Sequence, residues 1–270
     1  MEEDFSKYNG EGSTLRKAQL RMLDILVEVD KICRKHNITY WLDFGTLLGA
    51  VRHKGFIPWD DDLDITVFRK DYKRLRKALQ NELPKQFVFQ DWTTEKYAFD
   101  NYARVRDKNS LFDWKYFRFQ KDRGLFCDIF VAEKGVSVKL KKKIDVLFGR
   151  VFRTLNNYGY VTCNTAFKRR FLYFCAVCLA PLAYFLVFLE RMAAKIIPND
   201  LLILSFGTNW YSERHTNDIF PLQEISFENH SFFVPNNTDK YLKHLYGNYM
   251  QLPPENQRRE WHNNAKIEVY

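Results

Sequence analysis

The stretch Pro58–Ile65, which reads PWDDDLDI, places four carboxylates within five positions. If a β-strand begins at Asp62, the side chains of Asp62 and Asp64 share one face, about 7 Å apart, while Leu63 faces a core. At an effective dielectric of about 20, two carboxylates roughly 6 Å apart repel by about 3 kcal/mol. Hard divalent cations with oxygen ligands remove this cost. The stretch therefore predicts a metal-binding strand, with Mg²⁺ as the ion and Mn²⁺ as the alternative.

The other two aspartates of this stretch differ in their expected orientation. Asp60 has the parity of Asp62 and Asp64 along a strand, so it is predicted to be a third metal ligand. Asp61 has the opposite parity and is expected to matter less. A solvated turn or a calcium loop is the alternative, which the alternating apolar residues from Leu63 to Val67 disfavour.

The residues before this stretch predict a phosphate-binding turn. Residues 13–36 have a helical apolar period, and a β-rich segment at 38–44 then leads into Gly45 and Thr46, followed by a short helix at 46–51. A glycine turn before a helix start exposes N–H groups that bind phosphate. Gly45 and Thr46 are therefore predicted to contact phosphate beside the metal site.

A third carboxylate is predicted on a separate strand. Asp128 is the single charge in an otherwise apolar segment, and a carboxylate in a buried strand usually has a partner or a function. It is predicted to position or deprotonate an attacking hydroxyl, with a buried salt bridge to an arginine as the alternative. Together the pattern indicates an α/β protein, with a helix at 71–83 and strands at 57–68, 87–92, 102–106 and 124–131.

Five cations near these motifs are candidates for binding the phosphates of a nucleotide donor, because arginine in particular suits bidentate contact. Arg104 and Arg106 share one face of their predicted strand, and Arg106 is the one expected nearer the rim. His53 is equally well explained as a structural donor or as a base. The set is Arg52, His53, Lys54, Arg104 and Arg106.

The composition is that of a globular protein with an anionic partner. The chain has 270 residues, 46% of them apolar, which excludes a disordered chain, and its net charge is +9. A scattered, odd set of five cysteines and an N-terminus without an apolar run predict a cytoplasmic location. The basic cluster at 168–170 borders a long apolar run, which favours an anionic membrane surface, and no nucleic acid is predicted as a partner.

The middle of the chain is predicted to be a helical insertion at 139–205, between a catalytic core at 1–138 and the rest of the catalytic domain at 206–270. Its apolar run, 171–189, is interrupted by Pro181. A kinked pair of short helices in the interface at the inner face of the plasma membrane is expected, with a buried core hairpin and a true span as alternatives. The tail predicts a hairpin at 220–234 and a helix at 238–246.

Several motifs resemble the LicD family of phosphocholine transferases, which also includes the fukutin-like ribitol-phosphate transferases. The motifs are residues 45–53, 55–65, 104–109, 127–130, 241–247 and 252–254. The resemblance implies a nucleotidyltransferase-like mixed sheet flanked by helices, and transfer of a phosphoalcohol from a CDP-alcohol such as CDP-choline to a glycan hydroxyl. It also implies that Asp62 and Asp64 hold the metal, that Asp128 is the third carboxylate, and that Gly45 and Thr46 contact phosphate. Zinc, which some fukutin-like members bind through cysteines, is not predicted because no suitable set of four ligands is present.

The donor alcohol determines which side chains its pocket needs. Choline, a quaternary ammonium, favours an aromatic cage, whereas ribitol favours polar groups. Trp59, beside the acidic stretch, is the candidate cage residue, with core packing as its alternative. Phosphocholine transfer to a cell-surface glycan precursor, lipid-linked if the apolar run contacts a membrane, is the leading function. Transfer of another phosphoalcohol, such as ethanolamine or ribitol phosphate, nucleotidyl transfer and a non-enzymatic membrane scaffold are the alternatives.

Overall fold

The computed structural model describes residues 4–259, 262 and 265–270 as a mixed α/β structure. The helices are α1 Ser6–Asn9, α2 Thr14–Lys35, α3 Phe44–His53, α4 Arg69–Glu82, α5 Val138–Leu155, α6 Gly159–Thr162, α7 Ala166–Ile196, α8 Thr216–Ile219 and α9 Thr238–Tyr246. The strands are β1 Tyr40–Leu42, β2 Asp64–Phe68, β3 Phe87–Gln90, β4 Ala103–Asp107, β5 Ser110–Asp113, β6 Phe126–Lys134, β7 Leu201–Leu204, β8 Arg214–His215, β9 Gln223–Phe227, β10 His230–Val234 and β11 Lys266–Val269.

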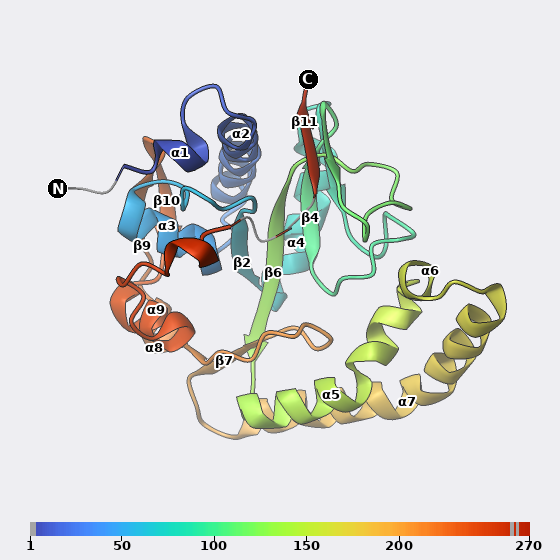
Figure 1. Ribbon diagram of the computed structural model, residues 1–270. Helices are drawn as coiled ribbons and strands as arrows, with labels where there is room; N and C mark the ends of the chain where they lie inside the picture. Colours follow the sequence, from blue (N-terminus) through green and yellow to red (C-terminus); the bar gives the residue numbers. More distant parts are fainter. Residues whose placement is uncertain (1–3, 260–261, 263–264) are drawn as a thin grey trace.

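The main sheet is mixed, with the strand order β1-β2-β6-β4-β3 (Figure 1). The β2–β6 pair is parallel and its other pairs are antiparallel. The long strand β6 is lined on one side by β2, and on the other by β4 along its first half and β7 along its second half. The predicted class, a mixed sheet flanked by helices, is confirmed.

Helix α2 packs on the sheet through one apolar stripe, as its sequence period predicts. Met22, Ile25 and Val29 are fully buried in the core that the sheet also lines. The helix begins where Ser13 accepts a hydrogen bond from the Arg16 N–H at 3.2 Å, a typical N-cap. The expected hairpin and final helix of the tail are also confirmed, as β9–β10 and α9.

Two boundaries near the acidic stretch differ from the prediction. The expected glycine turn lies inside α3, which already begins at Phe44 with Asp43 as its N-cap. Strand β2 begins only at Asp64, so residues 57–63 are not strand. The helix starts one residue before the glycine because the Asp43 side chain accepts from the Phe44 N–H at 2.8 Å. The strand starts late because the residues before it form a turn, in which the Asp60 N–H donates to the Ile57 carbonyl at 2.9 Å.

The segment between β6 and β7 contains α5 and α7 packed side by side, with the short α6 at the turn (Figure 1). The expected kinked pair of short helices is wrong, since α7 is one continuous helix of 31 residues with Pro181 inside it. Pro181 lacks an N–H and so removes one backbone hydrogen bond, but the helix continues on both sides of it. The predicted insertion, 139–205, also includes β7, which pairs with β6 in the main sheet.

The α5–α7 hairpin, defined here as residues 138–196, is joined to the sheet by an ion-pair cluster. Glu133 near the end of β6 accepts from Arg191 of α7 at 2.7 and 3.0 Å, and its Oε2 also lies 2.7 Å from Arg69 Nε at the start of α4. A single buried carboxylate therefore connects the hairpin, the sheet and α4.

Candidate functional site

An acidic cavity of about 260 Å³ lies where α3, β2 and β6 meet. Four aspartates from the sequence analysis line it, together with aromatic side chains from several elements and one histidine. The aspartates are Asp60, Asp62, Asp64 and Asp128, and the rings belong to Phe44, Tyr102, Phe130, Trp210, Tyr246 and His262. The expected convergence of aspartates from two strands on one cavity is thus observed.

Strand register places two of these carboxylates next to each other. Asp64 is the register partner of Asp128 in the parallel β2–β6 pair, and the Asp128 N–H donates to the Leu63 carbonyl at 2.8 Å. Arg104 is the register partner of Asp128 in the antiparallel β4–β6 pair. Three adjacent strands therefore present Asp64, Asp128 and Arg104 in one row across the sheet.

Gly45 and Thr46 support the aspartates directly. The Thr46 hydroxyl accepts from the Asp64 N–H at 2.7 Å, and Thr46 is buried. A Cβ added at Gly45 would lie 2.6 Å from Asp60 Oδ2, so only glycine allows that carboxylate to approach α3. Gly45 still lines the cavity, whereas the Thr46 hydroxyl, predicted to contact phosphate, instead fixes the start of β2.

The loop before β2 is held from behind by α2. The buried side chain of Gln19 donates to the Ile57 carbonyl at 3.3 Å and to the Asp60 carbonyl at 3.0 Å. The Asp60 N–H in turn donates to the Ile57 carbonyl at 2.9 Å. These hydrogen bonds fix the backbone from which Asp60 and Asp62 reach the cavity, so a turn performs the role expected of a strand.

The parity argument for Asp61 is wrong, because residues 60–63 are not strand. Asp61 is fully buried, and its carboxylate accepts from the His262 N–H at 3.2 Å, with the ring Nδ1 of His262 at 3.3 Å. Ligand atoms of Asp61, Asp62 and His262 lie within 4.8 Å of one another. Sequence analysis missed His262, since a lone histidine some 200 residues from its partner carries no local signal.

The electrostatics of the cavity favour a bound cation. Burial raises the pKa of Asp60 to about 7, with the neighbouring charge of Asp61 as the second cause. Burial also raises the pKa of Asp62 and of Asp64 well above the usual range, and the other aspartates of the cavity add to both shifts. Asp64 and Asp128 are buried and Asp60 and Asp62 partly buried, and oxygen ligands in this number fit a hard divalent ion, which lowers the cost of keeping them charged.

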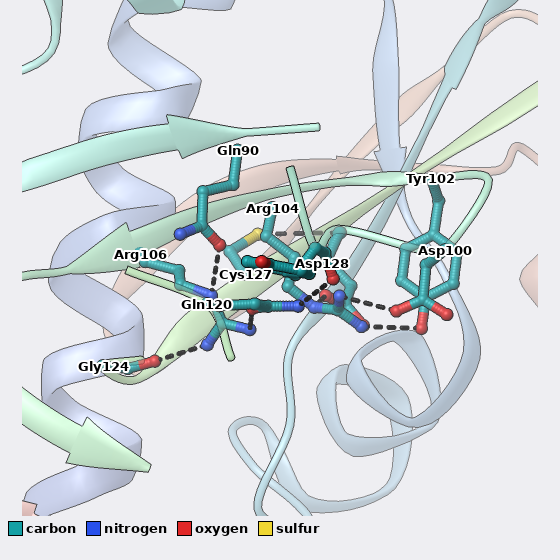
Figure 2. Close-up of polar contacts among 10 residues, drawn as sticks. Gln90, Asp100, Tyr102, Arg104, Arg106, Gln120, Gly124, Cys127 and Asp128 are labelled. Carbon is teal, nitrogen blue, oxygen red and sulfur yellow. Dashed lines mark hydrogen bonds and ion pairs between the residues drawn. The ribbon is translucent and has the colours of Figure 1, made fainter. Parts of the chain in front are cut away.

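The alternative weighed for Asp128, a salt bridge with an arginine, is present. Arg104 Nε lies 2.7 Å from Asp128 Oδ1, while other guanidinium nitrogens of Arg104 donate to Asp100 at 2.7 Å and to the Tyr102 hydroxyl at 2.8 Å (Figure 2). Burial raises the pKa of Asp128 and Arg104 opposes that shift. Arg104 therefore orients a cavity carboxylate, and its guanidinium is already occupied by protein partners.

Arg106 is not at the site, contrary to the prediction. It is fully buried and donates to Gln90 at 2.7 Å, to the Gly124 carbonyl at 2.7 Å and to Gln120 at 3.1 Å (Figure 2). Burial, with Arg104 next, lowers its pKa. Arg106 shares a strand face with Arg104 as predicted, but the 120–124 loop covers it, so it is a packing residue.

The predicted substrate ligands at the end of α3 also lie outside the cavity lining. Arg52 donates to the Tyr249 carbonyl at 2.8 Å and to the ring of His53, and Lys54 ends the helix in a left-handed conformation, exposed. Trp59 is buried against Phe5 and other aromatic rings. Helical rise explains the position of Arg52 and Lys54, since His53 at the far end of α3 lies about 12 Å from Gly45 along the helix axis.

A buried network behind the cavity, which sequence analysis missed, holds its aromatic wall. Phe44 lines the cavity with a φ of 45°, a left-handed conformation that is unfavourable for a bulky residue. Its neighbour Asp43 pairs with Arg214 at 3.1 Å and accepts from the Tyr241 hydroxyl at 2.9 Å, all three fully buried. Arg214 also lies 4.7 Å from the Phe44 ring centre, so this network positions Phe44.

A mixed sheet whose adjacent strands carry aspartates into one cavity beside a helix start fits the nucleotidyltransferase-like domain that the motifs imply. Comparison with known families identifies which one: residues 37–145 match the family described as LicD/FKTN/FKRP, nucleotidyltransferase domain. This match to a LicD-family domain confirms the resemblance seen in the motifs.

The sequence is also similar to several individual proteins, some with a named activity and some uncharacterised. The chain is 28% identical over 274 residues to the lipopolysaccharide cholinephosphotransferase LicD of Haemophilus influenzae, covering 92% of this chain and 96% of that protein. It is 41% identical over 78 residues to an uncharacterised protein of Rickettsia prowazekii, covering 29% of this chain and 28% of that protein. A third match is human ribitol 5-phosphate transferase FKRP, 50% identical over 34 residues, covering 13% of this chain and 7% of that protein. These similarities support a phosphotransferase.

Proposed function

We propose that this protein transfers phosphocholine from CDP-choline to a hydroxyl of a cell-surface glycan precursor. The observation that carries the proposal is the cavity in which Asp62, Asp64 and Asp128 converge opposite a wall of aromatic rings. Full-length similarity to a lipopolysaccharide cholinephosphotransferase supports the same reaction. The precursor belongs to the lipopolysaccharide, teichoic acid or capsule class.

The carboxylates suit the chemistry of phosphoryl transfer. The acceptor oxygen attacks the phosphorus that bears choline, the bond from this phosphorus to the bridging oxygen breaks, and CMP leaves with the electron pair. Asp62 and Asp64, with Asp60 beside them, would hold Mg²⁺, and a bound Mg²⁺ would supply positive charge against the pyrophosphate of the donor. Asp128, fixed by Arg104, orients the hydroxyl and accepts its proton, and its raised pKa suits that role.

The aromatic wall favours choline over ribitol as the donor alcohol. Phe44 lies 4.9 Å from both Phe130 and Trp210, and Tyr102 stacks on Phe130 at 4.4 Å, measured between ring centres. Rings gathered beside carboxylates attract a quaternary ammonium by cation–π and charge interactions. This cluster replaces Trp59, which packs in the core, as the cage for choline.

Location follows from the acceptor in this proposal. A lipid-linked glycan precursor at the inner leaflet places the enzyme in the cytoplasm, peripheral on the plasma membrane. The net charge of +9 and the single helix that is long and apolar enough to cross a membrane, among the described residues, support contact with an anionic bilayer.

Donor choice can be tested by binding and by product mass. With Mg²⁺, CDP-choline is expected to raise the melting temperature more than CDP-ribitol or CDP-ethanolamine, because a ligand that binds only the folded state stabilises it. The product should gain phosphocholine and release CMP. A product that retains cytidine would establish nucleotidyl transfer instead, and stabilisation by CDP-ribitol alone would establish the ribitol-phosphate alternative, which the short match to FKRP favours.

The aromatic cage has its own variant test. Trp210→Leu should raise the KM for CDP-choline by about 10-fold, since a desolvated cation–π contact contributes on the order of 1–2 kcal/mol. Trp92→Leu is the matched control, because Trp92 is exposed and stacks on Tyr72 away from the cavity. Equal KM values for the two variants would show that the ring of Trp210 does not bind choline.

A further inference from the structure

Helix α7 exposes its large apolar side chains and buries its small ones. Its most apolar 18 residues have a mean hydropathy of 2.3, yet only 17% of them are buried. The face against α5 carries Ala176, Ala183 and Val187, whereas Phe167 is 80% and Phe174 is 65% exposed. Soluble helices show the opposite arrangement, so the alternative of a buried core hairpin is wrong.

Helix α5 extends this apolar surface and adds positive charge to it. Val146 and Leu147 are 71% and 69% exposed. They line a shallow depression together with Lys139, Lys142 and Lys143. Apolar side chains bordered by lysines match the two layers of an anionic bilayer surface, the acyl chains and the head groups.

The two ends of α7 are tied to the same catalytic domain. At its C-terminal end, Glu190 accepts from the Val136 N–H at 2.8 Å and Arg191 pairs with Glu133. At its N-terminal end, Arg169 lies 4.0 Å from the centre of the Tyr160 ring, which contacts Tyr97 edge-on at 5.0 Å. A helix crossing a bilayer would place these two ends on opposite sides, which the ties do not allow.

A pocket of about 450 Å³ lies where the basic cluster meets the apolar face, and it is lined by Arg169, Arg170, Tyr173 and Phe174 among others. Among the described residues, neither arginine forms an ion pair with a carboxylate. The first turn of α7 also contains no acidic residue. Two arginines beside exposed aromatic rings suit a phosphate group at the boundary between head groups and acyl chains.

We propose that the α5–α7 hairpin lies flat in the interfacial layer of an anionic membrane, with α7 parallel to the bilayer plane and Arg169 and Arg170 on lipid phosphates. The choice of a bilayer as the binding partner of this surface rests on the proposed function, which needs a lipid-linked acceptor. The surface itself is defined by exposure, charge and the two ties of α7, so its binding is measured without catalysis.

Vesicle co-sedimentation of the full chain tests the surface. The protein should bind vesicles of phosphatidylcholine with phosphatidylglycerol more tightly than vesicles of phosphatidylcholine alone. Phe174→Glu with Phe185→Glu should weaken binding by at least about 100-fold, because two exposed phenylalanines no longer enter the bilayer. Leu20→Glu, which alters an exposed apolar residue of α2, is the matched control and should bind as the unaltered chain does.

The arginine pocket is tested by its lipid preference. Arg169→Gln with Arg170→Gln should reduce the preference for phosphatidylglycerol by about 10-fold and leave binding to phosphatidylcholine unchanged. Inorganic phosphate should not compete at millimolar concentration if lipid head groups are the ligand. Competition by free phosphate, or an unchanged lipid preference, would overturn the assignment of the pocket.

Labelling distinguishes a flat helix from a spanning one. Asn164→Cys and Lys195→Cys are made one at a time in a chain with Cys163→Ser, Cys175→Ser and Cys178→Ser, where Cys33 and Cys127 stay buried. Both new positions are exposed, one near each end of α7. With protein bound to preformed vesicles, a membrane-impermeant maleimide should label both from outside. Protection of one cysteine would show a span and overturn the proposal.

Two further outcomes separate this proposal from the proposed function. A chain that ignores vesicles and forms dimers through this face, with dimers lost in Phe174→Glu, would overturn the membrane assignment. Vesicle binding that is retained by a chain unable to use any CDP-alcohol would support the membrane surface while refuting the proposed reaction.

Discussion

The acidic cavity and the α5–α7 hairpin are both exceptions to the rule that charged side chains are exposed and apolar side chains are buried, and they are exceptions in opposite directions. In the cavity, four carboxylates converge in a largely buried space, and in the hairpin, phenylalanines and leucines lie in solvent. Each arrangement is unfavourable for a chain alone in water. The difference shows what each region lacks, since buried anions need a cation and exposed apolar side chains need an apolar surface.

The two regions also differ in how firmly they are held. Gln19 donates to the Asp60 carbonyl, while Thr46 and the Leu63 carbonyl accept from the N–H groups of Asp64 and Asp128, and these hydrogen bonds fix the backbone around the cavity carboxylates. The hairpin is held through α5, whose Lys141 donates to the Thr208 carbonyl at 3.0 Å, and through the ion pairs of Glu133, while the large apolar side chains of α7 are exposed. A rigid cavity suits phosphoryl transfer, which depends on positioning, whereas a surface that binds lipid needs no such precision.

The largest expected effect is that of removing one cavity carboxylate. Asp64→Asn should lower kcat by about 10³-fold, because a charge that holds the metal against the pyrophosphate is lost. Thermal stability without metal should be unchanged or higher, since the substitution relieves repulsion from Asp62 and Asp128. Vesicle binding should remain, which would show that the two regions act separately.

The control for this variant is Asp24→Asn, which changes an exposed carboxylate of α2. It should alter neither kcat nor melting temperature. If Asp64→Asn retained most of its activity, the cavity would not be the catalytic site.

The next effect compares the two buried arginines of β4. Arg104→Met should lower the free energy of unfolding by about 3–5 kcal/mol, because Asp128 and Asp100 are left buried without their partner. Arg106→Met should cost about 1–3 kcal/mol, since it removes hydrogen bonds to neutral acceptors only. Urea unfolding measures both values, and kcat should fall in Arg104→Met alone. If Arg106→Met lost as much activity as Arg104→Met, Arg106 would again be a candidate substrate ligand.

A smaller effect is expected where the hairpin meets the sheet. Arg191 is partly exposed, so Arg191→Gln should cost less than about 1 kcal/mol of unfolding free energy. It should nevertheless speed hydrogen exchange in residues 186–196, because one of the ties of α7 is lost. Lys195→Gln is the control on the same helix. Unchanged exchange in Arg191→Gln would mean that Glu133 does not hold the hairpin.

Sequence periodicity predicted most elements because burial repeats along an element. The stripe of α2 and the apolar β2 and β6 strands could be identified this way, whereas the parallel register of Asp64 with Asp128 is seen only in the structure. The site was predicted less completely, since distance along the chain was used in place of distance in space. Arg52 and Lys54 follow Gly45 closely in sequence but lie at the far end of α3, whereas His262, near the C-terminus in sequence, lines the cavity.

The last expected effect, comparable in size, concerns His53, whose predicted substrate role the structure does not support. Burial, with the charge of Arg52 second, lowers the pKa of His53 to about 4, below its ordinary value of about 6.5. Between these two pH values the unfolded chain binds a proton that the folded chain does not, so stability falls as the pH falls from about 7 towards 4. Because the ring is partly exposed, the effect is on the order of 1 kcal/mol, or about 2 °C in melting temperature.

His53→Gln should therefore show a shallower decline of melting temperature from pH 7 to pH 5 than the unaltered chain, with kcat unchanged at pH 7. An identical decline in both chains would mean that His53 does not titrate in this range on unfolding, and a loss of kcat would restore it as a candidate base.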